Sequence, residues 1–428
     1  MRLYNTILGS YTPAFFHMDL SFPFRGGERA YEKLNEKEIS IFTHEYIHFI
    51  QDITTYIGYN NLYVYSEYLH GAVNEIYKKP LGNIDLPIIL DNKSGNINLN
   101  QFINKESCGD IQEVNDFFLI NITYEKKKVP YKNPFVSHIR KVKLHSAKND
   151  IVDFGYLAIM ESMAYLIEKQ ITKGCTTPPD FPYRSAEMVV NMYYKEFGDD
   201  HLRIIALCDA SLQFSEPARI FIESLQEFKK MNFNPNNAND ITDYFYNKKC
   251  IQMGNPVDLT MGIINIGLMT AERLKLYMNN TSFKPFHDTI HIIIGFGISQ
   301  RIENRYFILD IVRNGYAATN PLLSKFLTRA GTPIIKDKNE DYWIIPPIGK
   351  NLSNYWLEYF PAIEGIYNTI AKGSDICELC TWCEKSPHIK QDDRCTNEPW
   401  KRIEDKSLCP YAMLWKHWNL SGYIPNVK

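Results

Sequence analysis

One stretch near the start of the chain, residues 35–58, constrains the fold most, because it combines a helical pattern of apolar residues with two histidines four positions apart. Its apolar side chains recur at steps of three and four residues and form one stripe: Ile39, Phe42, Tyr46, Ile50, Ile53 and Ile57. This spacing is typical of an α-helix that packs one face against a core. Asn35 and Glu38 are typical of a capping box, and Gly58 is typical of a stop. We therefore expect one amphipathic helix between Asn35 and Gly58.

The polar face of this expected helix carries the sequence His44-Glu45-Tyr46-Ile47-His48. At about 100° per residue, His44 and His48 project from nearly the same face, almost opposite the apolar stripe. Two imidazoles placed in this way can bind one metal ion, and Glu45 then lies beside the coordination sphere. Glu45 can serve there as the general base for water at a zinc ion. The alternative is a pair of surface histidines on an amphipathic helix.

A catalytic zinc ion usually has three protein ligands, and the best candidate for the third is Glu161. Residues 154–168 form a second expected helix, in which Glu161 shares a face with Leu157 and Ala164. A carboxylate that is turned toward packing costs several kcal/mol unless a cation neutralises it. The alternatives are a half-buried glutamate paired with an arginine or a lysine, and an exposed glutamate beside Glu168.

Other side chains can be compared with Glu161 by their geometry. Asp52 faces the same side as His48 but lies one turn farther, about 6 Å along the helix axis. It is better suited to orienting an imidazole through its other ring nitrogen. His145 is a further possibility without a supporting pattern. His287 and His291 form another four-residue pair, in a segment equally suited to a strand or a helix. They could bind metal, stabilise a transition state by hydrogen bonding, or be structural.

Together these residues resemble the gluzincin group of zinc metallopeptidases. In that group the two histidines of His-Glu-x-x-His and a glutamate on a later helix hold the zinc ion, and the motif glutamate activates water. The resemblance implies that His44, His48 and Glu161 are ligands of a catalytic Zn²⁺ and that Glu45 is the general base. It covers the two helices only, and the long separation between His48 and Glu161 implies an insertion that folds outside them.

The C-terminal end carries a second metal-binding pattern, which consists of Cys377-x2-Cys380-x2-Cys383 followed by Cys395 and Cys409. Thiolates that are two residues apart can converge on one soft metal ion, so four of the five could hold a structural Zn²⁺. The triple spacing followed by a distant Cys-Pro pair is also typical of an iron–sulfur cluster. Buried cysteines without any metal are the remaining interpretation.

Composition and patterning also predict the overall organisation. With 428 residues, 45% of them hydrophobic and 22% charged, the chain can bury one large core or two to three smaller units. We expect an α+β fold that is predominantly helical. Its expected parts are a zincin-like catalytic core over 1–175 with a β-rich insertion at about 80–150, a mainly helical region over 176–372 that completes the cleft, and a cysteine-rich metal-binding segment over 373–428.

Individual elements follow from local patterns. Strands are expected near 14–22, 117–124, 136–144 and 342–345, and helices at 186–197, 217–230, 259–278 and 351–372. The strand near 14–22 could pair with an extended substrate, or it could be an ordinary strand of the sheet.

Charge and cysteine usage limit the class of partner. The net charge of −2 gives no general reason to expect nucleic acid. We expect no membrane span and no signal peptide, because the chain lacks a sufficiently long apolar run and its first residues lack the pattern of a leader. Nine cysteines, an odd number concentrated at one end, favour a reducing cytoplasmic setting over an extracellular disulfide framework. No pattern addresses the oligomeric state.

The sequence therefore predicts a zinc-dependent metalloendopeptidase, a hydrolase that cleaves peptide bonds of a protein or peptide substrate. Glu45 would take the proton of the attacking water and pass it to the departing amine. A tyrosine or a histidine from the later helical region is expected to stabilise the oxyanion. The contrasting hypothesis is a non-catalytic interaction protein, in which metals shape only the fold and the cysteine-rich end is a zinc or iron–sulfur module.

Overall fold

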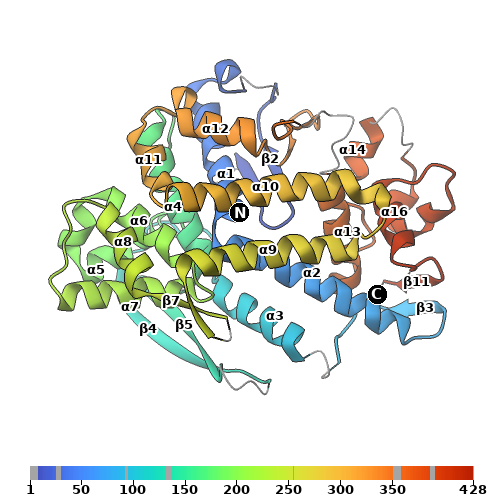
Figure 1. Ribbon diagram of the computed structural model, residues 1–428, viewed down its shortest axis with the longest axis horizontal. Coiled ribbons are helices and arrows are strands. Elements are labelled where there is room, and N and C mark those ends of the chain that lie inside the picture. Colours follow the sequence, from blue (N-terminus) through green and yellow to red (C-terminus); the bar gives the residue numbers. More distant parts are fainter. Residues whose placement is uncertain are drawn as a thin grey trace.

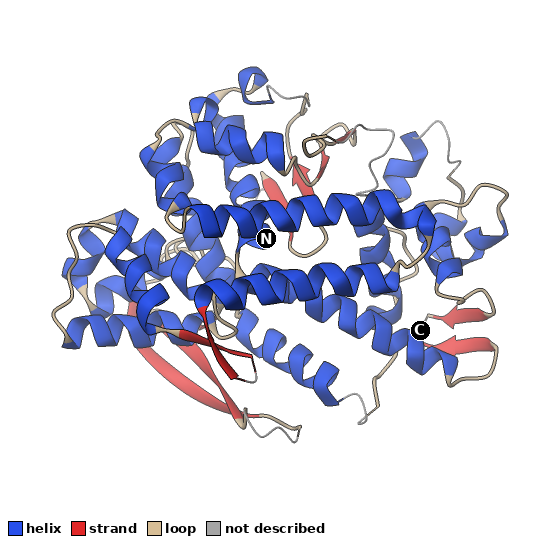
Figure 2. Ribbon diagram, in the orientation of Figure 1, coloured by secondary structure: helices blue, strands red, loops and turns tan. Residues whose placement is uncertain are grey.

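The computed structural model describes residues 8–25, 30–91, 95–131, 136–253, 255–349, 358–385 and 391–427. Within these residues the protein has a mixed α+β fold that is predominantly helical, which confirms the expected class. Figure 2 shows a body of helices with short groups of strands around it. In the described part of the chain, none of the helices combines the length and the apolar character needed to cross a membrane.

The helices and strands have the following bounds. The helices are α1 (Glu36–Thr54), α2 (Tyr56–Tyr77), α3 (Gly95–Cys108), α4 (Tyr156–Ile171), α5 (Ser185–Tyr193), α6 (His201–Ser211), α7 (Pro217–Lys230), α8 (Asn239–Lys248), α9 (Leu259–Tyr277), α10 (Lys284–Glu303), α11 (Phe307–Arg313), α12 (Pro321–Arg329), α13 (Tyr359–Lys372), α14 (Cys380–Lys385), α15 (Arg394–Asn397) and α16 (Pro410–His417). The strands are β1 (Gly9–Thr12), β2 (His17–Leu20), β3 (Gly82–Asp85), β4 (Leu119–Lys128), β5 (His138–Ser146), β6 (Ile151–Phe154), β7 (Cys250–Met253), β8 (Asn255–Asp258), β9 (Ile334–Lys336), β10 (Tyr342–Trp343) and β11 (Tyr423–Asn426).

The strands form small, separate sheets. One sheet has the order β1-β2-β9-β10, a second has the order β4-β5-β6, and two strand pairs are formed by β3 with β11 and by β7 with β8. β4 and β5 are the strands expected near 117–124 and 136–144, and they pair as an antiparallel hairpin. Residues 80–150 also contain α3, which the sequence did not reveal. This helix has a short apolar repeat, Leu99, Phe102 and Ile103, but its four asparagines lower the helix propensity of the segment.

The expected helix between Asn35 and Gly58 is in fact two helices. The capping box is present, since the Asn35 side chain accepts from the Glu38 N–H and the Glu38 side chain accepts from the Asn35 N–H. However, α1 ends at Thr54, and Gly58 lies in the first turn of α2. Thr55 is extended, and its hydroxyl accepts from the Gly58 N–H, which caps α2. The predicted stop at Gly58 was therefore wrong, because the chain already turns at Thr55.

Helix α1 is covered on all sides. It packs against α4, α10, α2 and β1, and every residue from Ile39 to Thr54 is buried. α10 approaches so closely that a Cβ on Gly297 would lie 1.7 Å from the Ile53 carbonyl oxygen, and only glycine allows this contact. Arg301 of α10 also donates to the Thr54 carbonyl, at 2.8 Å, while it pairs with a buried aspartate of α6. The polar face of α1 is thus buried, and its side chains need partners inside the protein.

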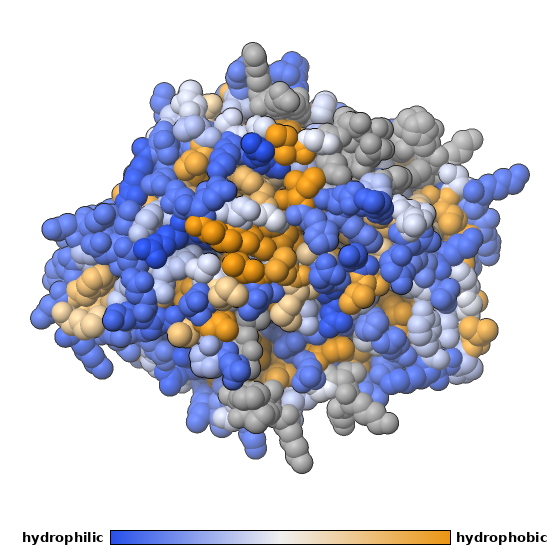
Figure 3. Space-filling model, in the orientation of Figure 1, coloured by the Kyte–Doolittle hydropathy of each residue, from blue (hydrophilic) through white to orange (hydrophobic). Residues whose placement is uncertain are grey.

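The long helices α9 and α10 lie side by side across one face of the molecule (Figure 1). Figure 3 shows apolar side chains gathered on that face, over these two helices. Exposed large apolar residues of α9 include Leu268, which is 52% exposed, and Met269, which is 43% exposed.

The strand expected near 14–22 is β2, and it has a neighbour on each side. β2 pairs antiparallel with β1 and parallel with β9. Because both of its edges are occupied, β2 cannot accept an added substrate strand, and that interpretation of residues 14–22 was wrong. β1, in contrast, lies at the edge of this sheet among the described strands.

Candidate metal centre

The structure brings His44 and His48 of α1 together with Glu161 of α4. Nε2 of His44 lies 3.0 Å, and Nε2 of His48 3.3 Å, from the same oxygen of Glu161, Oε2. All three residues are at most 1% exposed. Their ligand atoms lie within 4.8 Å of one another and could hold a metal ion. Two distant segments of the sequence therefore meet at one point, as predicted.

The second nitrogen of each ring is held by a neighbour that determines where the proton sits. Nδ1 of His44 lies 2.9 Å from Oε2 of Glu168, and Nδ1 of His48 lies 2.8 Å from Oε1 of Gln51. The Gln51 amide nitrogen donates to a backbone carbonyl of α4, so its oxygen must accept from His48. In the neutral form of each ring, Nε2 therefore carries the lone pair and faces Glu161.

Two lone pairs and a carboxylate oxygen repel one another unless a proton or a cation lies between them. Burial lowers the pKa of His44, but hydrogen bonds to Glu161 and Glu168 outweigh burial and raise it to about 10, so a proton can take this place. Burial lowers the pKa of His48, and its Nε2 has no hydrogen-bond partner among the described residues. Two imidazole nitrogens and one carboxylate oxygen in a buried group are a donor set that fits Zn²⁺.

Glu45 lies beside this group without belonging to it. It is buried, and its Oε2 has no hydrogen-bond partner within the described part of the chain. Burial raises the pKa of Glu45 to about 8, while the charge on His44 acts in the opposite direction. A carboxyl group that titrates near neutral pH can both accept and return a proton. Strand β1 lies directly against it, since a Cβ on Gly9 would be 2.8 Å from Oε1 of Glu45.

Asp52 does not orient an imidazole, so its predicted role was wrong. Its Oδ2 accepts from the Tyr11 hydroxyl at 2.9 Å and from the Ala14 N–H at 2.7 Å, which holds β1 and the following turn against α1. The ring of Tyr11 also stacks beside His48, with ring centroids 6.3 Å apart. A helical wheel gives the face on which Asp52 lies but not the neighbour that it meets, and one turn beyond His48 this neighbour is the turn after β1.

The other histidines considered from the sequence lie elsewhere. His287 and His291 belong to α10, so their segment is a helix and not a strand. His291 is exposed. Burial lowers the pKa of His287, and the charged groups that also act on this pKa belong to α9 and α10. His145 of β5 bonds to the hydroxyl of Thr123 in the β4–β5 hairpin, at 2.7 Å. The structure does not bring these residues to the metal ligands.

Two residues of the centre, Glu168 and Gln51, were missed in the sequence analysis. Glu168 follows Glu161 by seven positions, which is two turns on the same face of α4. Gln51 follows His48 by three positions on α1, so it also shares the face of a ligand. The signal that could have found them is a polar side chain one or two turns from a proposed ligand, on a helix with few other polar groups on that face.

Replacing Glu168 by Gln is expected to weaken zinc binding by about 10- to 100-fold, because the neutral amide no longer stabilises the Nδ1–H of His44. Competition with a chromophoric chelator measures this affinity. The matched control is Glu187→Gln, since Glu187 also pairs with a histidine, His201, at 3.2 Å but lies on α5. Equal zinc affinity of E168Q and the unaltered protein would contradict the assigned role of Glu168.

The five C-terminal cysteines are all buried. They share that end of the molecule with α14, α15 and α16, far along the chain from the ligands on α1 and α4. Among the described residues, their sulfurs do not form a group of three within 4.8 Å like the one at His44.

A cavity of about 700 Å³ reaches the end of β1 and the first turn of α4, the helix that carries Glu161. Its walls include Thr12 and Pro13 at the end of β1, and Tyr156 and Leu157 in the first turn of α4, one turn before Glu161. Aromatic and amide side chains dominate the rest of its lining. This volume is in the range of sites that bind small ligands or a few residues of a peptide.

Comparison with protein families, with curated proteins and with solved structures finds no match to this chain. The geometry and chemistry of the centre itself are therefore the basis for the proposed function.

Proposed function

We propose that the protein is a zinc-dependent metalloendopeptidase of gluzincin type, in which His44, His48 and Glu161 hold the zinc ion and Glu45 is the general base. The observation that carries this proposal is the buried group of three ligand atoms with an unpartnered carboxylate oxygen of Glu45 beside it, among the described residues. A structural zinc site usually has four protein ligands, whereas a catalytic site has three and keeps one position open. The ligand number of this centre matches a catalytic site.

When bound at this centre, zinc supplies Lewis-acid chemistry, because it lowers the pKa of water and polarises a carbonyl group. Glu45 takes a proton from the water that attacks the peptide carbonyl and returns it to the departing amine. Burial raises the pKa of Glu45 in the metal-free protein, and a zinc ion held by the neighbouring ligands would lower it toward the ionised form that a base needs. Glu168 and Gln51 hold the two imidazoles in place through Nδ1.

Strand β1 supports an extended peptide as the substrate. It lies at the edge of its sheet among the described strands, and its Gly9 touches Glu45. A peptide added to this edge would run past Glu45 and be held through backbone hydrogen bonds, which tolerate varied side chains. The cavity beside Thr12 could receive one of those side chains. All nine cysteines are free, which supports the reducing, cytoplasmic setting expected from the sequence.

The burial of the centre favours a second candidate, a non-catalytic interaction protein in which the metal only shapes the fold. Because every ligand is almost fully buried, a substrate can enter only after β1 or a neighbouring element moves. Catalysis is favoured instead by the three ligands of the centre and by Oε2 of Glu45, which has no hydrogen-bond partner among the described residues. Both candidates predict bound zinc, but only the first predicts hydrolysis.

A direct assay separates the two candidates. The purified protein is incubated with a peptide library made from a proteome digest, and new termini are identified by mass spectrometry. For a peptidase we expect cleavage that stops on removal of zinc with a chelator and returns on addition of Zn²⁺. Zinc that is bound in a His44-dependent manner without any cleavage would instead favour the interaction protein.

A further inference from the structure

The five C-terminal cysteines form one buried group that comes from three segments, 377–383, 391–402 and 409–410. Each cysteine is between 3% and 9% exposed. The Cys377 N–H donates to the carbonyl of Cys395 at 2.9 Å, which joins the first two segments. Helix α16, which begins directly after Cys409, packs against residues 399–404, so the third segment lies beside the second.

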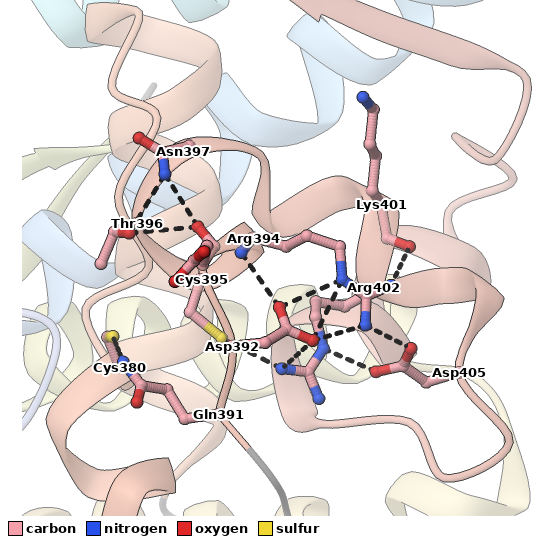
Figure 4. Close-up of polar contacts among 11 residues, drawn as sticks. Cys380, Gln391, Asp392, Arg394, Cys395, Thr396, Asn397, Lys401, Arg402 and Asp405 are labelled. Carbon is pink, nitrogen blue, oxygen red and sulfur yellow. Dashed lines mark hydrogen bonds and ion pairs between the residues drawn. The ribbon is translucent and has the colours of Figure 1, made fainter.

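Two of the sulfurs in this group accept hydrogen bonds from N–H donors. Nη1 of Arg402 lies 3.2 Å from Sγ of Cys395, and the amide nitrogen of Gln391 lies 3.0 Å from Sγ of Cys380 (Figure 4). Arg402 is buried, and its Nε also donates to Asp405 at 2.6 Å. A buried guanidinium that contacts a sulfur stabilises the negative thiolate rather than the neutral thiol. Hydrogen bonds of this kind to cysteine sulfur are a feature of metal–thiolate centres.

A single zinc ion and a cubane iron–sulfur cluster require different spacings of the sulfurs. At a Zn–S distance of about 2.3 Å, four tetrahedral sulfurs around one ion lie roughly 4 Å apart. In a cubane cluster each cysteine binds a different iron atom, so the sulfurs lie farther apart. Within the described part of the chain the cysteines do not form a compact group of the kind that His44, His48 and Glu161 form, which favours the cluster over one zinc ion.

We propose that this group of cysteines binds an iron–sulfur cluster and that Cys395, whose sulfur accepts a hydrogen bond from Arg402, is one of the ligands. Four thiolates complete such a cluster, so three further ligands come from Cys377, Cys380, Cys383 and Cys409, which carry the C-x2-C-x2-C pattern and the distant Cys-Pro pair. Iron and inorganic sulfide come from outside the chain, and each ligating thiol loses its proton to solvent as its Fe–S bond forms. The site is independent of the proposed peptidase centre.

The composition of the whole chain tests the proposal. The His44→Ala variant is used so that zinc from the first centre does not contribute. It is purified without oxygen, which would damage a cluster, and its iron, acid-labile sulfide and zinc are measured. We expect iron and sulfide in similar amounts and a brown protein with broad absorbance at about 400 nm. One equivalent of zinc without sulfide, or no metal after reconstitution with iron and sulfide, would overturn the proposal.

Two variants test the individual residues. Cys395→Ser should lower the iron and sulfide content by about tenfold or more, whereas Cys175→Ser, at a half-buried cysteine after α4, should leave both unchanged. A complete cluster in C395S would remove Cys395 from the ligands. The Arg402→Met variant should keep the cluster, and its reduction potential is measured. Removal of the N–H···S bond should shift this potential to a more negative value. An unchanged potential would show that Arg402 does not act on the cluster.

Discussion

The variant Glu45→Gln is expected to lose hydrolysis by about 100- to 10,000-fold while it keeps its zinc ion. Glutamine has nearly the same size and can occupy the same buried place, but it cannot accept a proton from water. Glu45 lies outside the group of three ligand atoms, so the zinc content should not change. Cleavage rates on a peptide found in the library assay and elemental analysis of the same samples measure the two quantities.

A matched control for this variant is Glu67→Gln on α2. Glu67 is also buried but pairs with Arg273, at 2.9 Å, and belongs to no part of the centre. It should hydrolyse as the unaltered protein does, once the amounts of folded protein are equalised. Full activity of E45Q with zinc bound would show that Glu45 is not the base. A search for protein termini that appear with the active chain but not with E45Q would then identify natural substrates.

The parts of the centre that could be predicted from the sequence are those that a single helix determines. His48 follows His44 by four positions, so their common face follows from helical geometry alone. Glu161 could be selected because its own helix turned a carboxylate toward packing. The contact between α1 and α4 had to be inferred in addition. The inference depended on the charge of Glu161, which needs a partner, and in the structure the two histidines lie beside this carboxylate.

Contacts between segments explain most of what the sequence did not reveal. The partner of Asp52 is Tyr11, which is 41 positions away, and no local pattern connects them. The end of α1 at Thr54 is determined by its packing on α10 and by a cap at Thr55, which competes successfully with the more obvious signal at Gly58. Helix α3 was missed for a different reason, because its four asparagines favour turns and obscure a short apolar repeat.

The burial of the polar face of α1 is the most important difference for function. An apolar stripe predicts which face packs against the core, but it does not require the opposite face to meet water. Here α4 and β1 cover that opposite face, and several polar groups on it have a specific neighbour, such as Glu168 for His44 and Tyr11 for Asp52. This arrangement gives the ligands fixed orientations, and it also requires a movement before a peptide can reach Glu45.

Replacing Glu161 by Ala should have the largest effect on metal binding. Only two imidazoles then remain, and zinc affinity should fall by more than about 100-fold, since even the loss of an outer partner costs 10- to 100-fold. Hydrolysis should be lost together with the metal. The same change should remove stabilisation by zinc. At a free zinc concentration of 100 times the dissociation constant, the unaltered protein gains about 2.7 kcal/mol in the free energy of unfolding, and E161A should gain almost nothing under the same conditions.

Chemical denaturation with and without Zn²⁺ measures this difference, and Glu67→Gln again serves as the control, because it should gain as much from zinc as the unaltered protein. The comparison of gains removes the loss of stability that each substitution causes by itself. In E161A the metal-free protein also loses the carboxylate that accepts from the protonated His44 ring, so its baseline should be lower as well. If E161A were stabilised by zinc as strongly as the control, the third ligand would have to be another residue, and the assignment that connects α4 to the metal would be wrong.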